Sequence, residues 1–330
     1  MATIKDIARE AGVAPSVVSR ALNNKYGVKE STKELIQKIA QRMDYHPNAA
    51  ARSLVTRKTD TIGIMMADLS EPYYSQIIKG MEYVASLEGF TLLFSNSYES
   101  VEHNRIMQKM VLAGRVDGLV IVGSNIEEKH FPLILLEHKI PFTLIERNLS
   151  DPRINCIWLD NIRGAYLAVK YLVEKGHRKI AHITGNTNFQ VALDRIEGYK
   201  NALLEAGIGF SDELMVPGNF ISRGGYEAMK ELLGRRPHCT AVFAASDSMA
   251  YGALQAISEA GLRVPDDIAV VGFDDLEFSG FTNPPLTTVR QPRYEMGQKS
   301  MELLVAILRG EGENGRKIHL DPELVIRKSV

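Results

Sequence analysis

The sequence predicts an α/β protein with a small helical N-terminal domain followed by two lobes, each a doubly wound parallel sheet covered by helices. Three observations support this prediction. Apolar residues recur at helical spacing in the first 46 residues, short apolar runs alternate with amphipathic stretches after residue 60, and the net charge changes sign between these parts. At 330 residues the chain is also too long for one ordinary core.

The first 23 residues have the pattern of two helices joined by a tight turn. Thr3, with Asp6 three residues later, is typical of a capped helix start, and Gly12 is expected to end that helix in a left-handed conformation. Pro15 suits the first turn of the next helix because it has no N–H that needs a partner there. The expected apolar faces are Ile4, Ile7, Ala8 and Ala11, then Val17, Val18, Ala21 and Leu22. This arrangement predicts a helix-turn-helix.

A third helix is expected to complete the N-terminal domain. Ser31 and Glu34 have the spacing of a capping box at its start. Its expected apolar side consists of Leu35, Ile36, Ile39, Ala40 and Met43.

Charge is divided unevenly along the chain. Residues 1–60 contain 11 Lys and Arg against 6 Asp and Glu, whereas the rest contains 28 against 34. A basic helix-turn-helix joined to an acidic body is typical of proteins that bind nucleic acid, and this asymmetry argues against a purely structural helical bundle.

A second DNA-binding element is expected at residues 48–56. Asn48 would cap a short helix that three alanines keep slim enough for the minor groove, and Leu54 would be a wedge between base pairs. A helix this short is only marginally stable alone in water, and we therefore expect it to become ordered only on DNA.

After residue 60 the pattern is that of parallel sheets covered on both faces. The expected strands are Thr61–Ala67, Phe90–Asn96, Gly118–Gly123, Phe142–Glu146, Lys179–Gly185, Ala241–Ser246 and Ile268–Phe273. The expected helices include Tyr73–Leu87, Gly164–Lys175, Arg195–Ala206 and Met249–Ala260. Because a strand, polar loop and long helix recur from residue 179, we expect two similar lobes with a ligand cleft between them.

Several function classes find no support in the sequence. No run of about 18 apolar residues exists, and no apolar signal segment begins the chain, so we expect a cytoplasmic protein. Cys156 and Cys239 have no CxxC or Cys/His context, which argues against disulfides and zinc and predicts buried thiols. The Asp274–Asp275 pair lacks further hard ligands for a metal. Without a nucleophile–base set, phosphate loop or GxGxxG motif, we expect no enzyme activity and no cofactor.

Several segments together resemble the lactose/galactose repressor (LacI/GalR) family of bacterial transcriptional regulators. They are TIKDIAREAGVAPSVVSRALN, RVDGLVIVG, KGHRKIAHITG, SDSMAYGAL, VVGFDD and PPLTTVRQP, and they cover essentially the whole chain. The resemblance implies a repressor that binds a pseudo-palindromic operator in double-stranded DNA as a homodimer. It also implies a small-molecule effector, a sugar or sugar derivative, in the cleft of a periplasmic-binding-protein-like domain.

The resemblance also implies four regions. These are a headpiece at 1–46, a hinge helix and linker at 47–59, a first lobe from 60–160 and 291–318, and a second lobe from 161–290 and 319–330.

The family positions implied for DNA contact are Thr3, Pro15, Ser16, Ser19, Arg20, Asn23, Asn48, Ala51 and Leu54. Arg20 would read a guanine edge with two parallel donors. Ala14 and Val17 stand where the family usually has Ser and Thr, which removes two hydroxyls that could meet phosphates.

The family positions implied for effector contact are Tyr73, Glu146, Arg147, Arg195, Phe220, Ser246, Asp274 and Gln291. Glu71, Glu146 and Ser246 replace residues that are frequent in sugar-binding members, so the identity of the effector stays open. Asp247 and Asp275 have an alternative interpretation as helix caps or partners of arginines.

Three further alternatives remain at this point. An enzyme on a doubly wound fold and a transport-type binding protein are the other function classes. The missing catalytic and phosphate-binding motifs argue against the enzyme, and the missing signal segment and the helix-turn-helix argue against the transport protein. Some members of the family respond to a phosphorylated protein partner, and nothing in the sequence decides that question.

Overall fold

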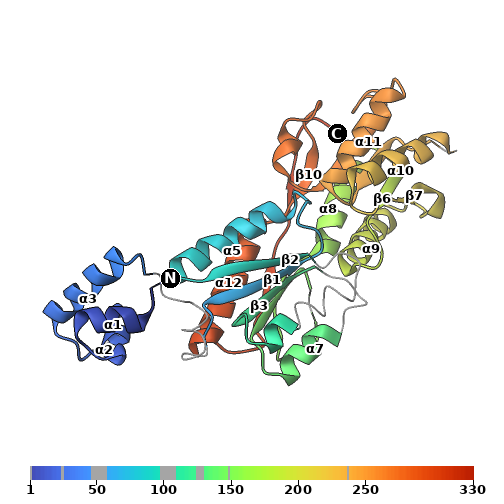
Figure 1. Ribbon diagram of the computed structural model, residues 1–330. Coiled ribbons are helices and arrows are strands. Elements are labelled where there is room, and N and C mark those ends of the chain that lie inside the picture. Colours follow the sequence, from blue (N-terminus) through green and yellow to red (C-terminus); the bar gives the residue numbers. More distant parts are fainter. Residues whose placement is uncertain are drawn as a thin grey trace. The chain divides into compact units, whose positions relative to one another are not determined.

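The computed structural model describes residues 2–23, 26–45, 58–96, 109–123, 130–147, 149–235 and 238–330. The chain forms two compact units, Met1–Thr59 and Asp60–Val330 (Figure 1). Within the described ranges, no helix is long and apolar enough to cross a membrane.

Among its described residues, the N-terminal unit has the helices α1 (Ile4–Ala11), α2 (Pro15–Leu22) and α3 (Glu30–Arg42). The capping box of Thr3 and Asp6 is present, and Gly12 ends α1 in the left-handed region with φ 66°. Pro15 lies in the first turn of α2, as expected. The core of this unit consists of Ile7, Ala8, Val18, Ala21, Ile36, Ile39 and Ala40. The helix-turn-helix prediction is therefore confirmed.

The predicted start of the third helix is wrong. Lys29 is the N-cap residue of α3, no side chain caps the helix, and Ser31 already lies inside its first turn. Glu30 places a negative charge at this helix end, where the helix dipole favours it. Leu35 is 47% exposed, because the buried side of α3 is set by Ile36 and Ile39.

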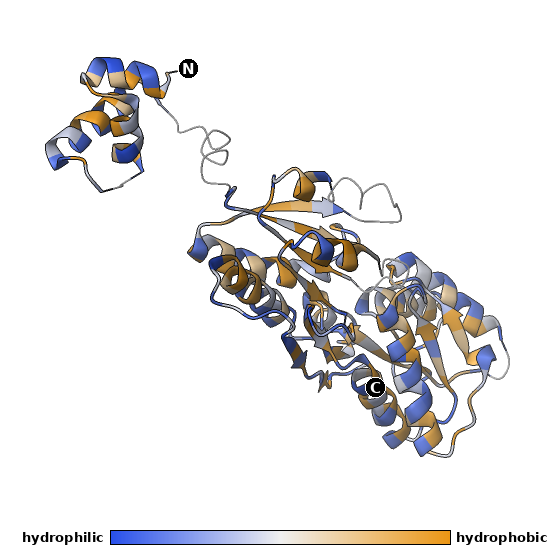
Figure 2. Cartoon of the chain, turned by 90° about the horizontal axis from the view of Figure 1, so that it is seen from below, coloured by the Kyte–Doolittle hydropathy of each residue, from blue (hydrophilic) through white to orange (hydrophobic). Residues whose placement is uncertain are grey.

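The first lobe of the larger unit is built on a six-stranded parallel sheet with the order β11-β5-β4-β3-β1-β2. Its strands are β1 (Thr61–Met66), β2 (Thr91–Asn96), β3 (Gly118–Val122), β4 (Phe142–Ile145), β5 (Asn155–Leu159) and β11 (Lys317–Leu320). Helices α5 (Tyr74–Glu88) and α12 (Arg293–Arg309) pack together on one face, and α7 (His130–Glu137) covers the other (Figure 1). Figure 2 shows the strands as the most hydrophobic layer, as expected for a sheet covered on both faces.

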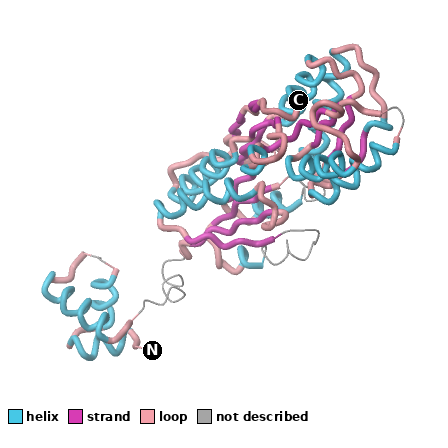
Figure 3. Tube along the Cα trace, turned by 90° about the horizontal axis from the view of Figure 1, so that it is seen from above, coloured by secondary structure: helices cyan, strands magenta, loops and turns pink. Residues whose placement is uncertain are grey.

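The second lobe contains a six-stranded sheet with the order β12-β10-β9-β8-β6-β7. Its strands are β6 (Ile180–Thr184), β7 (Met215–Pro217), β8 (Ala241–Ala244), β9 (Ala269–Asp274), β10 (Thr287–Arg290) and β12 (Glu323–Val325). Only β12, paired with β10, is antiparallel among these described strands. Its helices are α8 (Asn161–Glu174), α9 (Gln190–Glu205), α10 (Ser222–Gly234) and α11 (Asp247–Glu259), with the short turns η2 (Asp212–Leu214) and η3 (Glu277–Gly280). Figure 3 shows the helices flanking the strands of each sheet.

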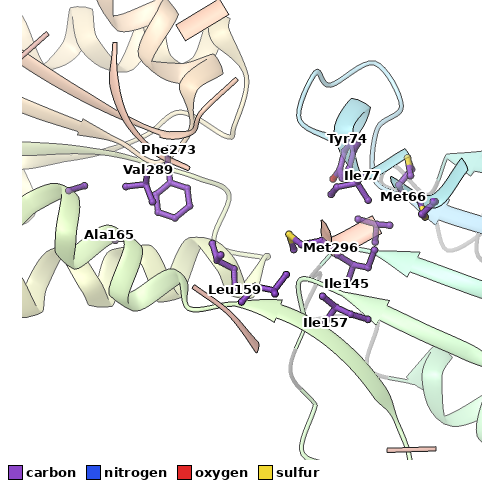
Figure 4. Packing of buried hydrophobic residues seen from close by; sticks show 14 of the residues in the cluster. Met66, Tyr74, Ile77, Ile145, Ile157, Leu159, Ala165, Phe273, Val289 and Met296 are labelled. Carbon is purple, nitrogen blue, oxygen red and sulfur yellow. The ribbon is translucent and has the colours of Figure 1, made fainter. Parts of the chain in front are cut away.

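The chain passes between the two sheets three times, from β5 to α8, from β10 to α12 and from β11 to β12. The sequence placed the last first-lobe segment at 291–318, whereas β11 continues to Leu320. One apolar cluster runs through both lobes, and Leu159 lies between its two parts (Figure 4). The lobes therefore share a core at the crossings while each carries its own sheet.

Candidate functional site

The polar face of α2 is the candidate surface for DNA. Ser16, Arg20 and Asn23 are exposed and Ser19 is half-buried, while Val18 and Ala21 on the opposite face are buried. The spacing of these polar residues places them along one side of the helix. This is the geometry with which a recognition helix enters the major groove.

Other predicted DNA residues have local structural roles. The Thr3 hydroxyl accepts from the Asp6 amide at 3.3 Å. The Thr3 hydroxyl and the Thr3 amide donate to Asp6 Oδ2 at 2.6 Å and 3.0 Å, and these two bonds lower the pKa of Asp6. Asn23 Nδ2 donates to the Ser19 carbonyl at 2.8 Å. Pro15 is exposed, and Ala14 before it caps α2 with no side-chain bond.

Asn48, Ala51 and Leu54 lie outside the described residues. Their predicted roles in the minor groove therefore rest on the sequence alone.

A second site forms where strands end at the junction of the two lobes. Tyr73 lies between β1 and α5, Glu146 follows β4, Asp274 ends β9, and Gln291 follows β10. The Tyr73 hydroxyl donates to Gln291 Oε1 at 3.1 Å, and Gln291 Nε2 donates to Asp274 Oδ1 at 2.7 Å. A continuous hydrogen-bond path thus runs from the first lobe through the crossing segment to the second.

Arg195 on α9 is buried beside this path. Its Nε donates to Asn161 Oδ1 at 2.9 Å and its Nη1 to the Ala245 carbonyl at 2.5 Å. The guanidinium is 3.8 Å from Asp274 Oδ1, and its central carbon lies 3.8 Å from the centre of the Phe273 ring. Arg195 is therefore held rigidly and orients Asp274.

Burial shifts the pKa of three groups at this site, Asp274, Glu146 and Tyr73. Burial raises the pKa of Asp274 to about 7, although Arg195 opposes the shift. Burial also raises the pKa of Glu146, whereas the adjacent Tyr73 hydroxyl and Arg195 lower it. The pKa of Tyr73 is raised well above its ordinary value by burial and by the Glu146 carboxylate. Carboxyl groups of this kind, near a phenol and an amide, are suited to exchange hydrogen bonds with ligand hydroxyls.

The remaining predicted effector residues lie around this centre. The Phe220 ring is 5.8 Å from the Arg195 guanidinium and covers Gly185 so closely that a Cβ there would lie 1.9 Å from it. Ser246 caps α11 by accepting from the Met249 amide at 3.2 Å. Arg147 is buried directly after Glu146.

The alternative interpretation is confirmed for Asp275, which pairs with arginines, whereas Asp247 is held by other partners and Ser246 is the cap residue of its helix. Asp247 begins α11 and is bonded to Ser279, Thr288 and the Leu276 amide. Asp275 pairs with Arg290 at 2.7 Å and with Arg327 at 2.6 Å. The two free cysteines, Cys156 and Cys239, are buried as expected.

Two further residues of the site escaped the sequence analysis. Asn161 holds Arg195, and Arg293 donates to backbone carbonyls of both lobes. The only available signal for Arg293 was its position just after the PPLTTVRQP motif.

A pocket of about 400 Å³ opens beside the same first-lobe loop. It is lined by Glu71 and Pro72 of the first lobe and by Ser222, Ser248, Tyr251, Phe278, Phe281 and Thr282 of the second. Burial raises the pKa of Glu71, and a hydrogen bond with Ser248 opposes the shift. None of the predicted effector residues lines this pocket.

Comparisons with known proteins agree with the geometry. Residues 3–48 match the family described as bacterial regulatory proteins, lacI family, and residues 169–330 match the periplasmic binding protein-like domain. The HTH-type transcriptional repressor PurR of Erwinia tasmaniensis is 36% identical over 331 residues, covering 100% of this chain and 97% of the relative. PurR of Pasteurella multocida is 35% identical, covering 100% and 99%.

Two solved structures are similar over nearly the whole chain. The lac repressor dimer bound to operator and the anti-inducer ONPF has a TM-score of 0.89 at 30% identity, covering 99% of this chain and 98% of that one. The complex of the transcriptional regulator CelR with cellobiose has a TM-score of 0.77 at 32% identity, covering 100% of both chains.

Proposed function

The chain belongs to the lacI family of bacterial regulatory proteins, and from this premise we propose that a sugar or sugar derivative, bound at the junction of the lobes, controls its repression of transcription. The protein is a DNA-binding transcriptional regulator with a helix-turn-helix headpiece and an effector-binding domain of two α/β lobes.

The observation that carries the proposal is the path from Tyr73 through Gln291 to Asp274, with Glu146 and Arg195 beside it. These groups come from both lobes, and Glu146, Asp274 and Gln291 lie at or directly after strand ends, where ligands bind in α/β sheets. A ligand with several hydroxyls would replace internal hydrogen bonds by its own, and the Phe220 ring offers an apolar face to its C–H groups. Cellobiose is the ligand of the CelR relative, which supports a sugar.

On the DNA side, we propose that Arg20 reads a guanine from α2 and that Ser16, Ser19 and Asn23 support it. A dimer would present two such helices to two half-sites, as in the lac repressor dimer bound to operator. Such a protein would act in the cytoplasm and without catalysis. Control by a phosphorylated protein partner is an alternative to control by a small molecule alone, and no observation on this chain favours it.

The proposal is tested with the full chain, a panel of neutral sugars and sugar phosphates, and a thermal-shift assay. A ligand that binds only the folded state raises the melting temperature. We expect at least one sugar to raise it in the wild type and to change operator affinity in an anisotropy titration.

The variant Glu146→Gln should lose most of the shift, because the carboxylate beside Tyr73 is gone. Glu205→Gln is the matched control, since Glu205 is exposed on α9 and pairs with Lys170. Equal binding by Glu146→Gln and the wild type would show that the effector lies elsewhere. If no sugar in the panel raises the melting temperature of the wild type, the proposed sugar effector is wrong.

A further inference from the structure

Arg293 joins the two lobes through a single side chain. Its Nη1 donates to the Tyr73 carbonyl of the first lobe at 3.2 Å, and its Nη2 donates to the Asp275 carbonyl of the second at 2.9 Å. The guanidinium also faces the Tyr73 ring, with its central carbon 5.8 Å from the ring centre. The residue is 7% exposed, so water competes little for these bonds.

The position of Arg293 in the chain suits this contact. It begins α12, which packs on α5 in the first lobe, and it lies three residues after the end of β10 in the second lobe. Tyr73 is the N-cap residue of α5. The guanidinium therefore lies where the chain passes between lobes. Because α12 packs in the first lobe, a change in lobe angle alters the distance from Arg293 to the Asp275 carbonyl of the second lobe.

The second-lobe partner is itself fixed. Asp274 and Asp275 both have left-handed backbones, with φ 126° and 53°. Strain of this kind persists only where surrounding contacts hold it. Arg290 and Arg327 hold the Asp275 carboxylate, and Gln291 holds Asp274. The turn thus directs the Asp274 carboxyl to the ligand network and the Asp275 carbonyl to Arg293.

We propose that Arg293 is a positioning residue that sets the angle between the lobes by clamping the Tyr73 loop of the first lobe to the Asp274–Asp275 turn of the second. Both clamped segments carry side chains of the proposed effector site. Binding at that site therefore acts on both ends of the clamp, and the clamp makes the two lobes respond as one. This inference rests on the proposed function for its link to the effector, but not for its effect on the lobe angle.

The lobe angle is measured by pulsed electron paramagnetic resonance on the full chain. Spin labels are placed at Lys79→Cys on α5 and Lys230→Cys on α10, both exposed, while the native cysteines are buried. We expect a narrow distribution of distances in the wild-type background. Arg293→Met keeps much of the side-chain length without any donor and should broaden or shift the distribution.

Two variants complete this measurement. Arg293→Lys has one compact ammonium that cannot reach both carbonyls in a fixed fork, so an intermediate distribution is expected, and it serves if Arg293→Met does not fold. Arg309→Met is the matched control, because Arg309 ends the same helix and pairs with Glu88 near the surface. It should leave the distribution unchanged. Distributions equal to the wild type in both folded Arg293 variants would overturn the inference.

A second readout separates coupling from binding. For any sugar that raises the melting temperature of the wild type, the ratio of operator Kd with and without that sugar should move toward one in Arg293→Met. If this ratio of operator Kd values is the same in Arg293→Met as in the wild type, Arg293 does not couple effector binding to DNA binding. If no sugar acts on the wild type, the proposed function fails as stated, while the resonance measurement still decides whether Arg293 sets the lobe angle.

Discussion

The contact between α5 and α12 depends on glycine, which makes Gly297→Ala a sharp test of the packing described above. A Cβ on Gly297 would lie 2.0 Å from the Ile77 carbonyl oxygen and 2.9 Å from the carbonyl carbon. Gly80 faces it from α5, where a Cβ would lie 2.1 Å from the Tyr294 oxygen. The obstacle in both cases is backbone, which cannot rotate away as a flexible side chain does.

Two opposing effects determine the expected magnitude. Alanine in a helix interior is favoured over glycine by about 1 kcal/mol. Overpacking a well-packed site costs about 1–3 kcal/mol, and a backbone obstacle places this substitution near the upper end. We therefore expect Gly297→Ala to lower the free energy of unfolding by about 2 kcal/mol.

Urea unfolding followed by fluorescence measures this loss. Trp158 is the single tryptophan of the chain and lies on β5, in the sheet that α5 and α12 cover. Gly209→Ala is the control, because a Cβ there meets nothing within 4 Å, and its stability should stay within about 0.5 kcal/mol of the wild type. A Gly297→Ala protein that is more stable than the wild type would show that helix propensity dominates and that the helices separate freely.

Further substitutions test the two sites and a buried histidine. Arg20→Ala should weaken operator binding by about 1–3 kcal/mol and binding to random DNA by less, and equal losses would show a contact to phosphate only. Arg195→Ala or Asp274→Ala should abolish the effector response while ligand-free operator binding persists; a folded variant without operator binding contradicts this assignment. Leu54→Ala should reduce operator affinity and the bend in circular-permutation gels, and an unchanged bend would make this segment a tether. Burial lowers the pKa of His182 to about 4. Its contribution to the free energy of unfolding is therefore fully present above pH 6.5 and is lost as the pH falls, because the unfolded chain binds the proton first. Going from pH 7.5 to 5.0 should thus cost about 2 kcal/mol through this group in urea unfolding, and His182→Phe should show a correspondingly smaller pH dependence.

The elements that the sequence predicted well are those determined by interactions between residues close together in the chain. Thr3 and Asp6 form their capping box within one turn, and Gly12 ends α1 through its own backbone freedom. The start of α3 was predicted at Ser31 because the capping pattern also fits a residue inside the first turn. The actual N-cap residue, Lys29, makes no side-chain cap, so no sequence pattern marks it.

The contacts at the lobe junction were less accessible to sequence reasoning. The resemblance indicated Tyr73, Arg195, Asp274 and Gln291, and the structure brings these four together. Arg293 was missed because its partners are backbone carbonyls, which carry no residue identity, at positions 220 and 18 residues away. Such contacts are fixed by the topology of the crossings and not by any pattern along the chain.

The pairing of β11 with β5 has a consequence for synthesis of the protein. β11 joins the first sheet about 160 residues after β5 in the chain, and α12, which covers one face of that sheet, also comes after the whole of α8 to β10. At about 5–20 residues per second, a ribosome needs on the order of 10–30 s to make this interval. During that time the apolar face that includes Ile64 and Val120 lacks the part of its cover that α12 supplies. The nascent first lobe therefore exposes part of this apolar face until α12 has emerged from the ribosome.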